Sequence, residues 1–137
     1  VGGRAAVVEQ APQLGTGHAV AQAGAALAGF DGPVLILFGD VPLVRPATCA
    51  ALLAALGDDG PDAVGVAVLG FRPANPGHYG RIIADGGRIG KMVEFKDASA
   101  AERAETLCNS GLMAVRGHDL FAWLSRITCN NAAGEYY

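Results

Sequence analysis

The sequence predicts an α/β fold in which helices cover a mostly parallel β-sheet, and two features support this prediction. Aliphatic runs of strand length alternate along the 137 residues with longer segments in which apolar residues recur at helical spacing, as in βαβ units. The run at residues 33–38 (PVLILF) is almost continuously aliphatic, which is typical of a strand covered on both faces. With 51% hydrophobic residues and no recognisable linker or repeat, the chain can bury a core without disulfides or a structural metal.

The first part of the chain is predicted to form two strands around one helix. Residues 4–9 (RAAVVE) are typical of a short buried strand. A helix over residues 16–28 follows, because Thr16 can serve as its N-cap and apolar residues continue behind it at helical spacing. The strong strand over residues 33–38 then ends at Gly39-Asp40.

The middle of the chain is predicted to continue with a helix, a strand and a hairpin. A helix over residues 46–56 begins with proline in its first turn and ends at a glycine, before a turn over residues 58–61. A strand over residues 63–69 comes next. After a Pro/Gly-rich connection, strands over residues 81–84 and 88–95 are joined across Asp-Gly-Gly, which is typical of a hairpin inserted into the α/β order.

The last part of the chain is predicted to contain two helices and one strand. Ser99 and Glu102 have the spacing of a capping box, which predicts a short helix. Residues 107–115 have the composition of another strand, and Asp119 can cap an amphipathic helix over residues 120–127.

Composition and charge argue against several classes of function. The 10 Lys+Arg and 13 Asp+Glu give a formal net charge of −3, which leaves no basic stripe for nucleic acid or anionic lipid. No apolar run approaches the roughly 18 residues of a membrane helix, and no signal-peptide pattern is present. Cys49, Cys108 and Cys129 are widely spaced, which predicts buried thiols and neither disulfides nor a zinc site. We therefore expect a cytoplasmic protein without nucleic-acid or membrane partners.

Asp40 is the strongest candidate for chemistry, because ligands of open α/β sheets bind beyond the carboxyl ends of the strands. It follows the most aliphatic strand, and Gly39 beside it lets a ligand approach the backbone. A carboxylate there can hold Mg²⁺, which prefers one or two protein carboxylates and completes its octahedron with water and phosphate oxygens. A turn-forming aspartate is the alternative. The residues alone therefore indicate Mg²⁺-dependent handling of a phosphorylated or nucleotide ligand.

Residues 14–18 (LGTGH) combine two glycines with a predicted helix start, where free backbone N–H groups favour anions. The segment is neither a Walker A loop nor a G-x-G-x-x-G fingerprint, so a simple capped helix start is the alternative. His18 is expected to be a polar residue of the first helical turn and not a catalyst. Further polar residues stand near strand ends, at 79–81, 94–98 and 109–111, where each by itself is typical of a turn or an exposed loop.

Several motifs occur together in a fixed order. They are residues 10–19 (QAPQLGTGHA), 38–43 (FGDVPL), 79–82 (YGRI), 93–98 (VEFKDA), 109–111 (NSG) and 130–137 (NNAAGEYY). Over essentially the whole chain, this set resembles the uridyltransferase domain of the bacterial bifunctional GlmU family. The GDVPL block recurs among sugar and molybdopterin nucleotidyltransferases, whereas the combination with the last motif is much more specific.

The resemblance implies a Rossmann-like sheet of the nucleotide-diphospho-sugar transferase (GT-A-like) type. It also implies transfer of UMP from UTP to N-acetylglucosamine 1-phosphate, which yields UDP-N-acetylglucosamine and pyrophosphate for cell-wall precursor synthesis. In such a reaction the sugar phosphate oxygen attacks the α-phosphorus in line, so the protein mainly positions two anions and neutralises charge.

The resemblance further implies roles for single residues. Asp40 matches the catalytic Mg²⁺ ligand of the family, and the ion would bridge phosphates. The other implied contacts are Gln10, Gly15 and Thr16 for the uracil, Phe38 and Gly39 for the nucleotide, Gly80, Glu94 and Asn109 for the sugar, and Tyr137 for the acetyl pocket. Phe38 stands where a tyrosine is common, which removes one hydroxyl.

The chain also departs from the family's pattern. The N-terminal Gly-rich nucleotide loop would precede Val1, and the sequence lacks a second metal-binding asparagine and the left-handed β-helix acetyltransferase domain. We therefore expect residues 1–137 to be an internal piece of the catalytic domain with little turnover alone, because an electrostatic clamp on phosphates is worth orders of magnitude in rate. Trimerisation is a family expectation that belongs to the missing domain.

Two other interpretations stay open. One is a different nucleotidyltransferase of the same fold, such as a molybdopterin cytidylyl- or guanylyltransferase, in which Glu94 and Asn109 would have no sugar to contact. The other is a non-catalytic nucleotide-sugar-binding module, for which a missing phosphate loop would be a genuine property of the protein.

Overall fold

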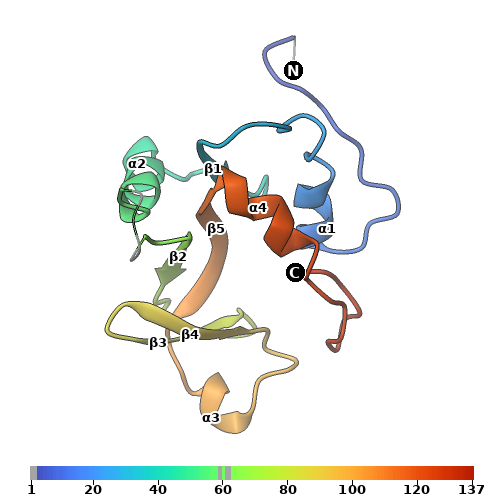
Figure 1. The fold of residues 1–137 in the computed structure, drawn as a ribbon. Helices are drawn as coiled ribbons and strands as arrows, with labels where there is room; N and C mark the ends of the chain where they lie inside the picture. Colours follow the sequence, from blue (N-terminus) through green and yellow to red (C-terminus); the bar gives the residue numbers. More distant parts are fainter. Residues whose placement is uncertain (1–2, 59, 61–62) are drawn as a thin grey trace. The chain divides into compact units, whose positions relative to one another are not determined.

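The computed structural model describes residues 3–58, 60 and 63–137 (Figure 1). The chain divides into two compact units. The first contains the described residues up to Val34 together with Arg116–Tyr137, and the second is Leu35–Val115. Within the described ranges, no helix combines the length and the apolar character needed to cross a membrane.

Two helices, α1 (Thr16–Ala21) and α4 (Gly117–Leu124), form the regular structure of the first unit. The helix predicted over residues 16–28 therefore ends early, and turns follow it, with Gln22 N donating to Ala19 O at 3.2 Å. Gly24 accounts for the early end, because glycine in a helix interior costs about 0.5–1 kcal/mol relative to alanine.

The predicted caps of these two helices are wrong. Gly15, with φ of 107°, is the N-cap of α1, and Thr16 is already the first helical residue. Helix α4 begins at Gly117, where the backbone N–H donates to Gly32 O at 3.0 Å, so the chain turns into the helix earlier than predicted. Asp119 consequently lies in the first turn and caps nothing.

The strand predicted over residues 4–9 does not form in the described structure. Its aliphatic side chains are exposed, Val7 by 78% and Val8 by 47%. A strand requires a neighbouring strand for its N–H and C=O groups. No described ladder reaches these residues, so the aliphatic pattern alone is not sufficient to form a strand.

The second unit is built on a β-sheet with two helices. Its elements are β1 (Pro33–Ile36), α2 (Pro46–Ala55), β2 (Val66–Phe71), β3 (Arg81–Asp85), β4 (Arg88–Val93), α3 (Ala100–Arg103) and β5 (Cys108–Arg116). The first two residues of β1 and the last residue of β5 belong to the first unit. The strand order is β1-β5-β3-β4, and β2 also pairs with β5 (Figure 1). The order of helices and strands confirms the predicted α/β class.

The strand pairs with a described register are all antiparallel, namely β2 with β5, β3 with β4, and β3 with β5. The sheet is therefore less parallel than predicted. Part of the reason is local, because β3 and β4 are joined by a turn too short for any parallel connection. In that turn Gly86 and Gly87 have φ of 54° and 81°, the left-handed values that a two-residue hairpin turn requires.

Local signals in the sequence place several elements of the second unit correctly. Helix α2 begins at Pro46, as predicted. The capping box before α3 is complete, since Glu102 N donates to Ser99 Oγ at 3.3 Å and Ser99 N donates to Glu102 Oε2 at 2.8 Å. Strand β2 begins three residues later than predicted, and the predicted turn at 58–61 includes positions outside the described residues.

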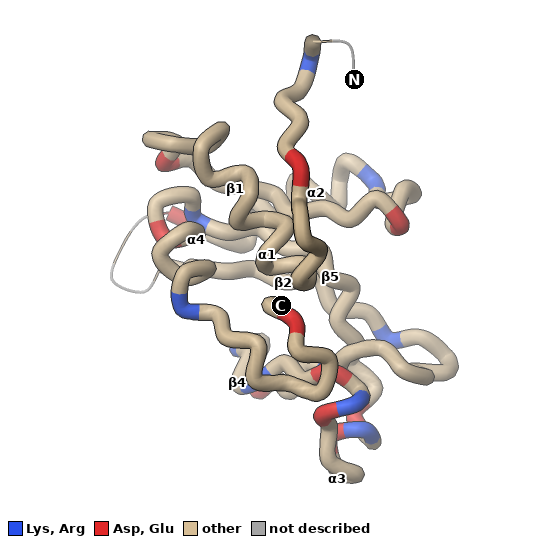
Figure 2. Tube along the Cα trace, turned by 90° about the vertical axis from the view of Figure 1, so that its right-hand side faces the viewer, with Lys and Arg blue, Asp and Glu red and all other residues tan. Residues whose placement is uncertain are grey.

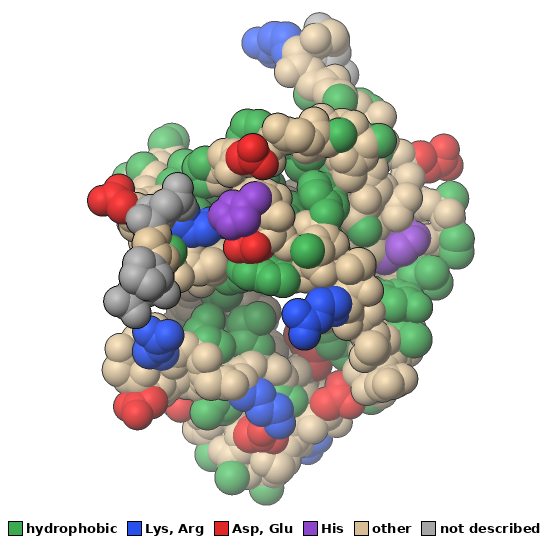
Figure 3. All heavy atoms as spheres, in the orientation of Figure 1, with side chains coloured by type: hydrophobic (Ala, Val, Ile, Leu, Met, Phe, Trp, Pro, Cys, Tyr) green, Lys and Arg blue, Asp and Glu red, His purple; other side chains and the backbone are tan. Residues whose placement is uncertain are grey.

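The core of the second unit lies between α2 and the sheet. Leu52, Leu56, Ala67, Leu112 and Ala114 form one buried cluster, each exposed by 9% or less. Charged residues of both signs are spread along the described trace (Figure 2) and are mixed with apolar ones on the face shown in Figure 3.

Candidate functional site

The sheet register brings Gly80, Glu94 and Asn109 together. Gly80 precedes β3 and Glu94 follows β4, and the register pairs Arg81 with Val93 and with Cys108. The backbone N–H of Asn109 accordingly donates to Gly80 O at 2.9 Å. A Cβ built on Gly80 would lie 2.9 Å from Glu94 Oε1, so only glycine leaves this carboxylate in place.

Glu94 is half-buried and presents free acceptor oxygens. Burial raises the pKa of its carboxyl, and the negative charge of Asp97 raises this pKa further. Among the described residues, no donor makes a hydrogen bond to its side-chain oxygens. The group can therefore accept hydrogen bonds from a polar ligand, which would also replace the water lost on burial.

Asn109 presents a free donor in the same cluster. Its Oδ1 accepts from the backbone N–H of Gly111 at 2.9 Å, while its Nδ2 has no partner among the described residues. Gly111 has φ of 79°, and a Cβ there would lie only 2.1 Å from Cε2 of Phe38. The Phe38 ring is thus in direct contact with the turn that holds Asn109.

Phe38, Gly39 and Asp40 form a turn after β1, closed by the backbone bond from Val41 N to Phe38 O at 3.2 Å. A Cβ on Gly39 would meet no atom within 4 Å, so the space beside this backbone is open. Asp40 is exposed, and its carboxylate makes no hydrogen bond to any described residue. An exposed, uncommitted carboxylate at this position fits the needs of a Mg²⁺ ion that shares its coordination with phosphate oxygens.

The described residues contain no group of three or more His, Cys, Asp or Glu side chains that could hold a metal. An all-protein metal cage is therefore absent from the described part of the chain. Mg²⁺ bound through one or two carboxylates does not require such a cage. Asp40, whose exposed carboxylate follows β1, remains the candidate ligand of such an ion.

In the first unit, the loop that contains Gln10, Gly15 and Thr16 is held by the C-terminal segment. Tyr136 N donates to Leu14 O at 2.8 Å, and Gly17 N donates to Tyr136 O at 2.8 Å. A Cβ on Gly15 would lie 2.6 Å from Tyr136 O. Close packing and the positive φ of Gly15 therefore both require glycine at this position.

The side chain of Gln10 lies across this loop. Its Nε2 donates to Gly15 O at 2.9 Å, so two of the residues predicted to contact the base lie together. The third, Thr16, follows Gly15 in the chain and is exposed. Tyr137 belongs to the same unit and is 41% exposed. The predicted site residues thus form two groups, one in each unit.

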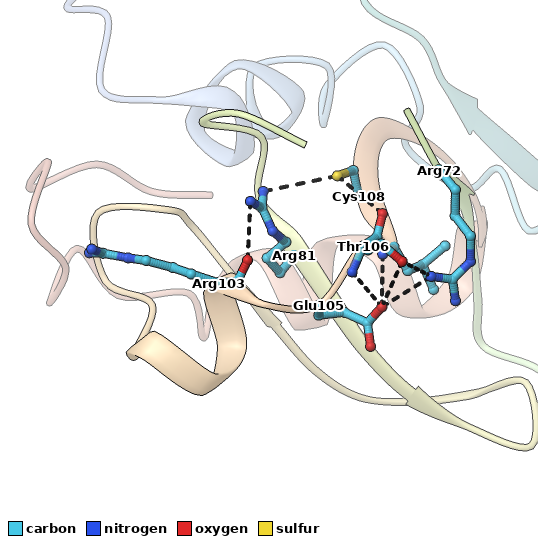
Figure 4. Close-up of polar contacts among 7 residues, drawn as sticks. Arg72, Arg81, Arg103, Glu105, Thr106 and Cys108 are labelled. Atoms are coloured by element: carbon cyan, nitrogen blue, oxygen red, sulfur yellow. Dashed lines mark hydrogen bonds and ion pairs between the residues drawn. The ribbon is translucent and has the colours of Figure 1, made fainter. Parts of the chain in front are cut away.

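Sequence reasoning missed residues that support both groups. In the second unit, Arg81 is 2% exposed, and its guanidinium donates to the backbone oxygens of Tyr79 and, at 3.0 Å, of Gly77. It also donates to the backbone oxygen of Arg103 at 3.5 Å (Figure 4). These bonds hold the loop that leads into Gly80. The YGR motif places this arginine beside Gly80 in the sequence, but only the fold shows that its charge is buried.

In the first unit, His18 was predicted to be an ordinary polar residue of a first helical turn. The residue does lie in the first turn of α1. In addition, its ring lies between two glutamine amides, with Gln10 Nε2 3.0 Å from Nδ1 and Gln22 Nε2 3.2 Å from Nε2. Gln22 has the i+4 spacing that brings it next to His18 on a helix, which was an available signal.

Comparisons with known proteins show which family the chain belongs to. The chain is 62% identical over 135 residues to the bifunctional protein GlmU of Sphingopyxis alaskensis, covering 98% of this chain and 30% of that protein. It is 61% identical over 138 residues to the bifunctional protein GlmU of Novosphingobium aromaticivorans, again covering 30% of that protein. The chain thus spans less than a third of these relatives, and the resemblance to the GlmU family is confirmed.

A solved structure shows the same fold. The crystal structure of apo-UDP-glucose pyrophosphorylase matches with a TM-score of 0.66 and 19% identity, over 96% of this chain and 48% of that one. In addition, the family model described as the MobA-like NTP transferase domain matches residues 2–124. The chain therefore belongs to the MobA-like NTP transferase domain family.

Proposed function

We propose that this chain provides the nucleotide-transfer machinery of an N-acetylglucosamine-1-phosphate uridyltransferase. The reaction transfers UMP from UTP to N-acetylglucosamine 1-phosphate and releases pyrophosphate, and its product, UDP-N-acetylglucosamine, is used for cell-wall precursors. The observation that carries the proposal is the cluster of Gly80, Glu94 and Asn109, because its free acceptor and donor groups suit a sugar with hydroxyl and amide substituents. High identity to bifunctional GlmU proteins supports the same conclusion.

The sugar would be held by complementary hydrogen bonds. Glu94 would accept from sugar hydroxyl groups, and Asn109 Nδ2 would donate to the N-acetyl carbonyl oxygen. Gly80 keeps the space in which the Glu94 carboxylate lies. Each buried partner that a wrong sugar leaves unpaired costs about 1–3 kcal/mol, so this cluster would determine acceptor specificity.

The transfer itself requires alignment of two anions. A phosphate oxygen of the sugar phosphate forms a bond to the α-phosphorus of UTP while the bond from that phosphorus to the pyrophosphate oxygen breaks. Asp40 would hold Mg²⁺, with the open backbone at Gly39 leaving room for the nucleotide. When bound, Mg²⁺ offsets the negative charge that builds up on the phosphates. Phe38, packed on Gly111, would keep this turn beside Asn109.

The base would be contacted by the loop of the first unit. Gln10 has an amide at this loop, Gly15 allows the close backbone approach, and Thr16 adds an exposed hydroxyl. Tyr137 would border the acetyl group. We also propose that the protein acts in the cytoplasm, without nucleic-acid or membrane partners. Residues 1–137 would be part of a larger transferase domain, since the matched relatives are more than three times as long. Trimer formation would depend on a further domain.

Pyrophosphate release tests this proposal. UTP and Mg²⁺ are incubated with the protein extended to its natural ends, and N-acetylglucosamine 1-phosphate, glucose 1-phosphate and no acceptor are compared. Release that requires the N-acetylated acceptor is expected. Nucleotide binding without release would favour the non-catalytic binding module, and release with neither sugar would favour another nucleotidyltransferase of this fold.

A further inference from the structure

The side-chain amide of Gln10 is fixed in one orientation. Its nitrogen lies 2.9 Å from the carbonyl oxygen of Gly15 and 3.0 Å from Nδ1 of His18. A carbonyl oxygen can only accept a hydrogen bond, so the amide atom facing Gly15 must be the NH₂ group. This group has two hydrogens, and the two neighbours account for both of them.

The amide oxygen of Gln10, Oε1, consequently has no hydrogen-bond partner among the described residues. An amide oxygen can only accept a hydrogen bond. When Nδ1 of His18 carries no hydrogen, rotating the amide by 180° would place Oε1 against two acceptors, the Gly15 oxygen and Nδ1. A ligand that meets Gln10 therefore meets an acceptor and not a donor.

Nδ1 of His18 accepts the second hydrogen bond that the Gln10 amide donates. In a neutral imidazole one ring nitrogen carries a hydrogen and the other accepts, so the ring can accept from only one of its two glutamine neighbours. The contact from Gln10 at 3.0 Å is shorter than that from Gln22 at 3.2 Å, and the Gln22 amide also donates to the backbone oxygen of His18 at 3.0 Å. The tautomer with a bare Nδ1 thus satisfies Gln10 and leaves Gln22 its backbone partner.

We infer that His18 is a positioning residue that favours uracil over cytosine, because its contact with Nε2 of Gln10 helps to keep Oε1 as the free group of this amide. The inference rests on the proposed function, in which Gln10 contacts the base. Uracil has an N–H donor at N3, which pairs with an acceptor, whereas cytosine has an acceptor at N3 and would be opposed by Oε1. Without His18 only the bond to Gly15 O would hold the amide, so turning it over to offer NH₂, which suits cytosine, would cost one hydrogen bond fewer.

The test compares UTP with CTP in three variants of the protein extended to its natural ends. His18→Leu fills most of the ring volume but accepts no hydrogen bond. His18→Asn restores an acceptor close to the position of Nδ1. Gln22→Ala is the matched control, because it removes the other amide from the same ring.

The measured quantity is the kcat/KM for UTP divided by that for CTP, with circular dichroism to verify folding. We expect His18→Leu to lower this ratio roughly tenfold, the effect of about one hydrogen bond, and His18→Asn to restore most of it. Gln22→Ala should keep the wild-type ratio. An unchanged ratio in His18→Leu, or an equal loss in Gln22→Ala, would overturn the inference.

Equilibrium binding of the two nucleotides separates this inference from the proposed function. A wild-type protein that releases no pyrophosphate from UTP refutes the proposed transfer reaction. The relative affinity for UTP and CTP in the same variants still decides the role of His18. Equal wild-type affinity for both nucleotides would overturn that role even if uridylyl transfer is observed.

Discussion

Replacing Gly111 with alanine should destabilise the second unit more than any change at a neighbouring glycine of the site. The residue has φ of 79°, which costs an L-amino acid about 1–2 kcal/mol. The new Cβ would also lie 2.1 Å and 2.6 Å from two atoms of the Phe38 ring, and overpacking of this kind typically costs about 1–3 kcal/mol. Together these effects predict a loss of about 2–5 kcal/mol in the free energy of unfolding.

Urea unfolding followed by circular dichroism measures this loss. Gly39→Ala is the matched control, because its Cβ would meet no atom within 4 Å and its φ is not positive. In a Phe38→Leu background, Gly111→Ala should lose the overpacking part of its cost, so the double variant should be less stable than Phe38→Leu alone by only about 1–2 kcal/mol of backbone strain. A Gly111→Ala protein as stable as Gly39→Ala, or a double variant without recovery, would refute the packing of Phe38 on Gly111.

Further predictions concern the metal site, the sugar site and a helix cap. Asp40→Asn should abolish Mg²⁺-supported turnover while the circular dichroism spectrum stays unchanged, and wild-type-like turnover would remove Asp40 from the metal site. The raised pKa of Glu94 means that the folded state binds this proton more tightly than the unfolded state, whose pKa is near 4.5. Glu94 therefore contributes stability below about pH 4.5 that is lost as the pH rises through the folded pKa. Glu94→Gln should abolish this decline in the free energy of unfolding, measured between pH 4 and 7. If the free energy of unfolding depends on pH as in the wild type, the burial of the carboxylate is contradicted. Ser99→Ala should cost about 1 kcal/mol of unfolding free energy through the lost capping box, whereas Ser125→Ala, which alters no N-cap, should cost less.

The parts of the fold that depend on neighbouring residues could be predicted from the sequence. The paired glycines at 86 and 87 determine a tight hairpin turn, and Ser99 with Glu102 determines the start of α3. Both are interactions within a few residues of the chain. Strand formation at residues 4–9 and antiparallel pairing along β5 depend on distant partners, which no local pattern reveals.

In the candidate site, too, the features set by neighbouring residues could be predicted, and the contacts between distant residues could not. The position of Asp40 after an aliphatic strand was evident from the sequence, and the motifs indicated Gly80, Glu94 and Asn109. That the last three share one cluster follows from the register of β3 with β4 and β5. The contact between Gln10 and His18 depends on how the loop folds back on itself, so hydrophobic periodicity could not reveal it.

The division of the proposed pocket between sugar and nucleotide is tested most directly by steady-state kinetics of Glu94→Ala, with both substrates varied. Glu94 has free acceptor oxygens beside Gly80 and is assigned to the sugar, so the KM for N-acetylglucosamine 1-phosphate should rise at least tenfold while that for UTP stays within twofold. Equal increases in both KM values, or no change in either, would contradict the assignment of this cluster to the sugar.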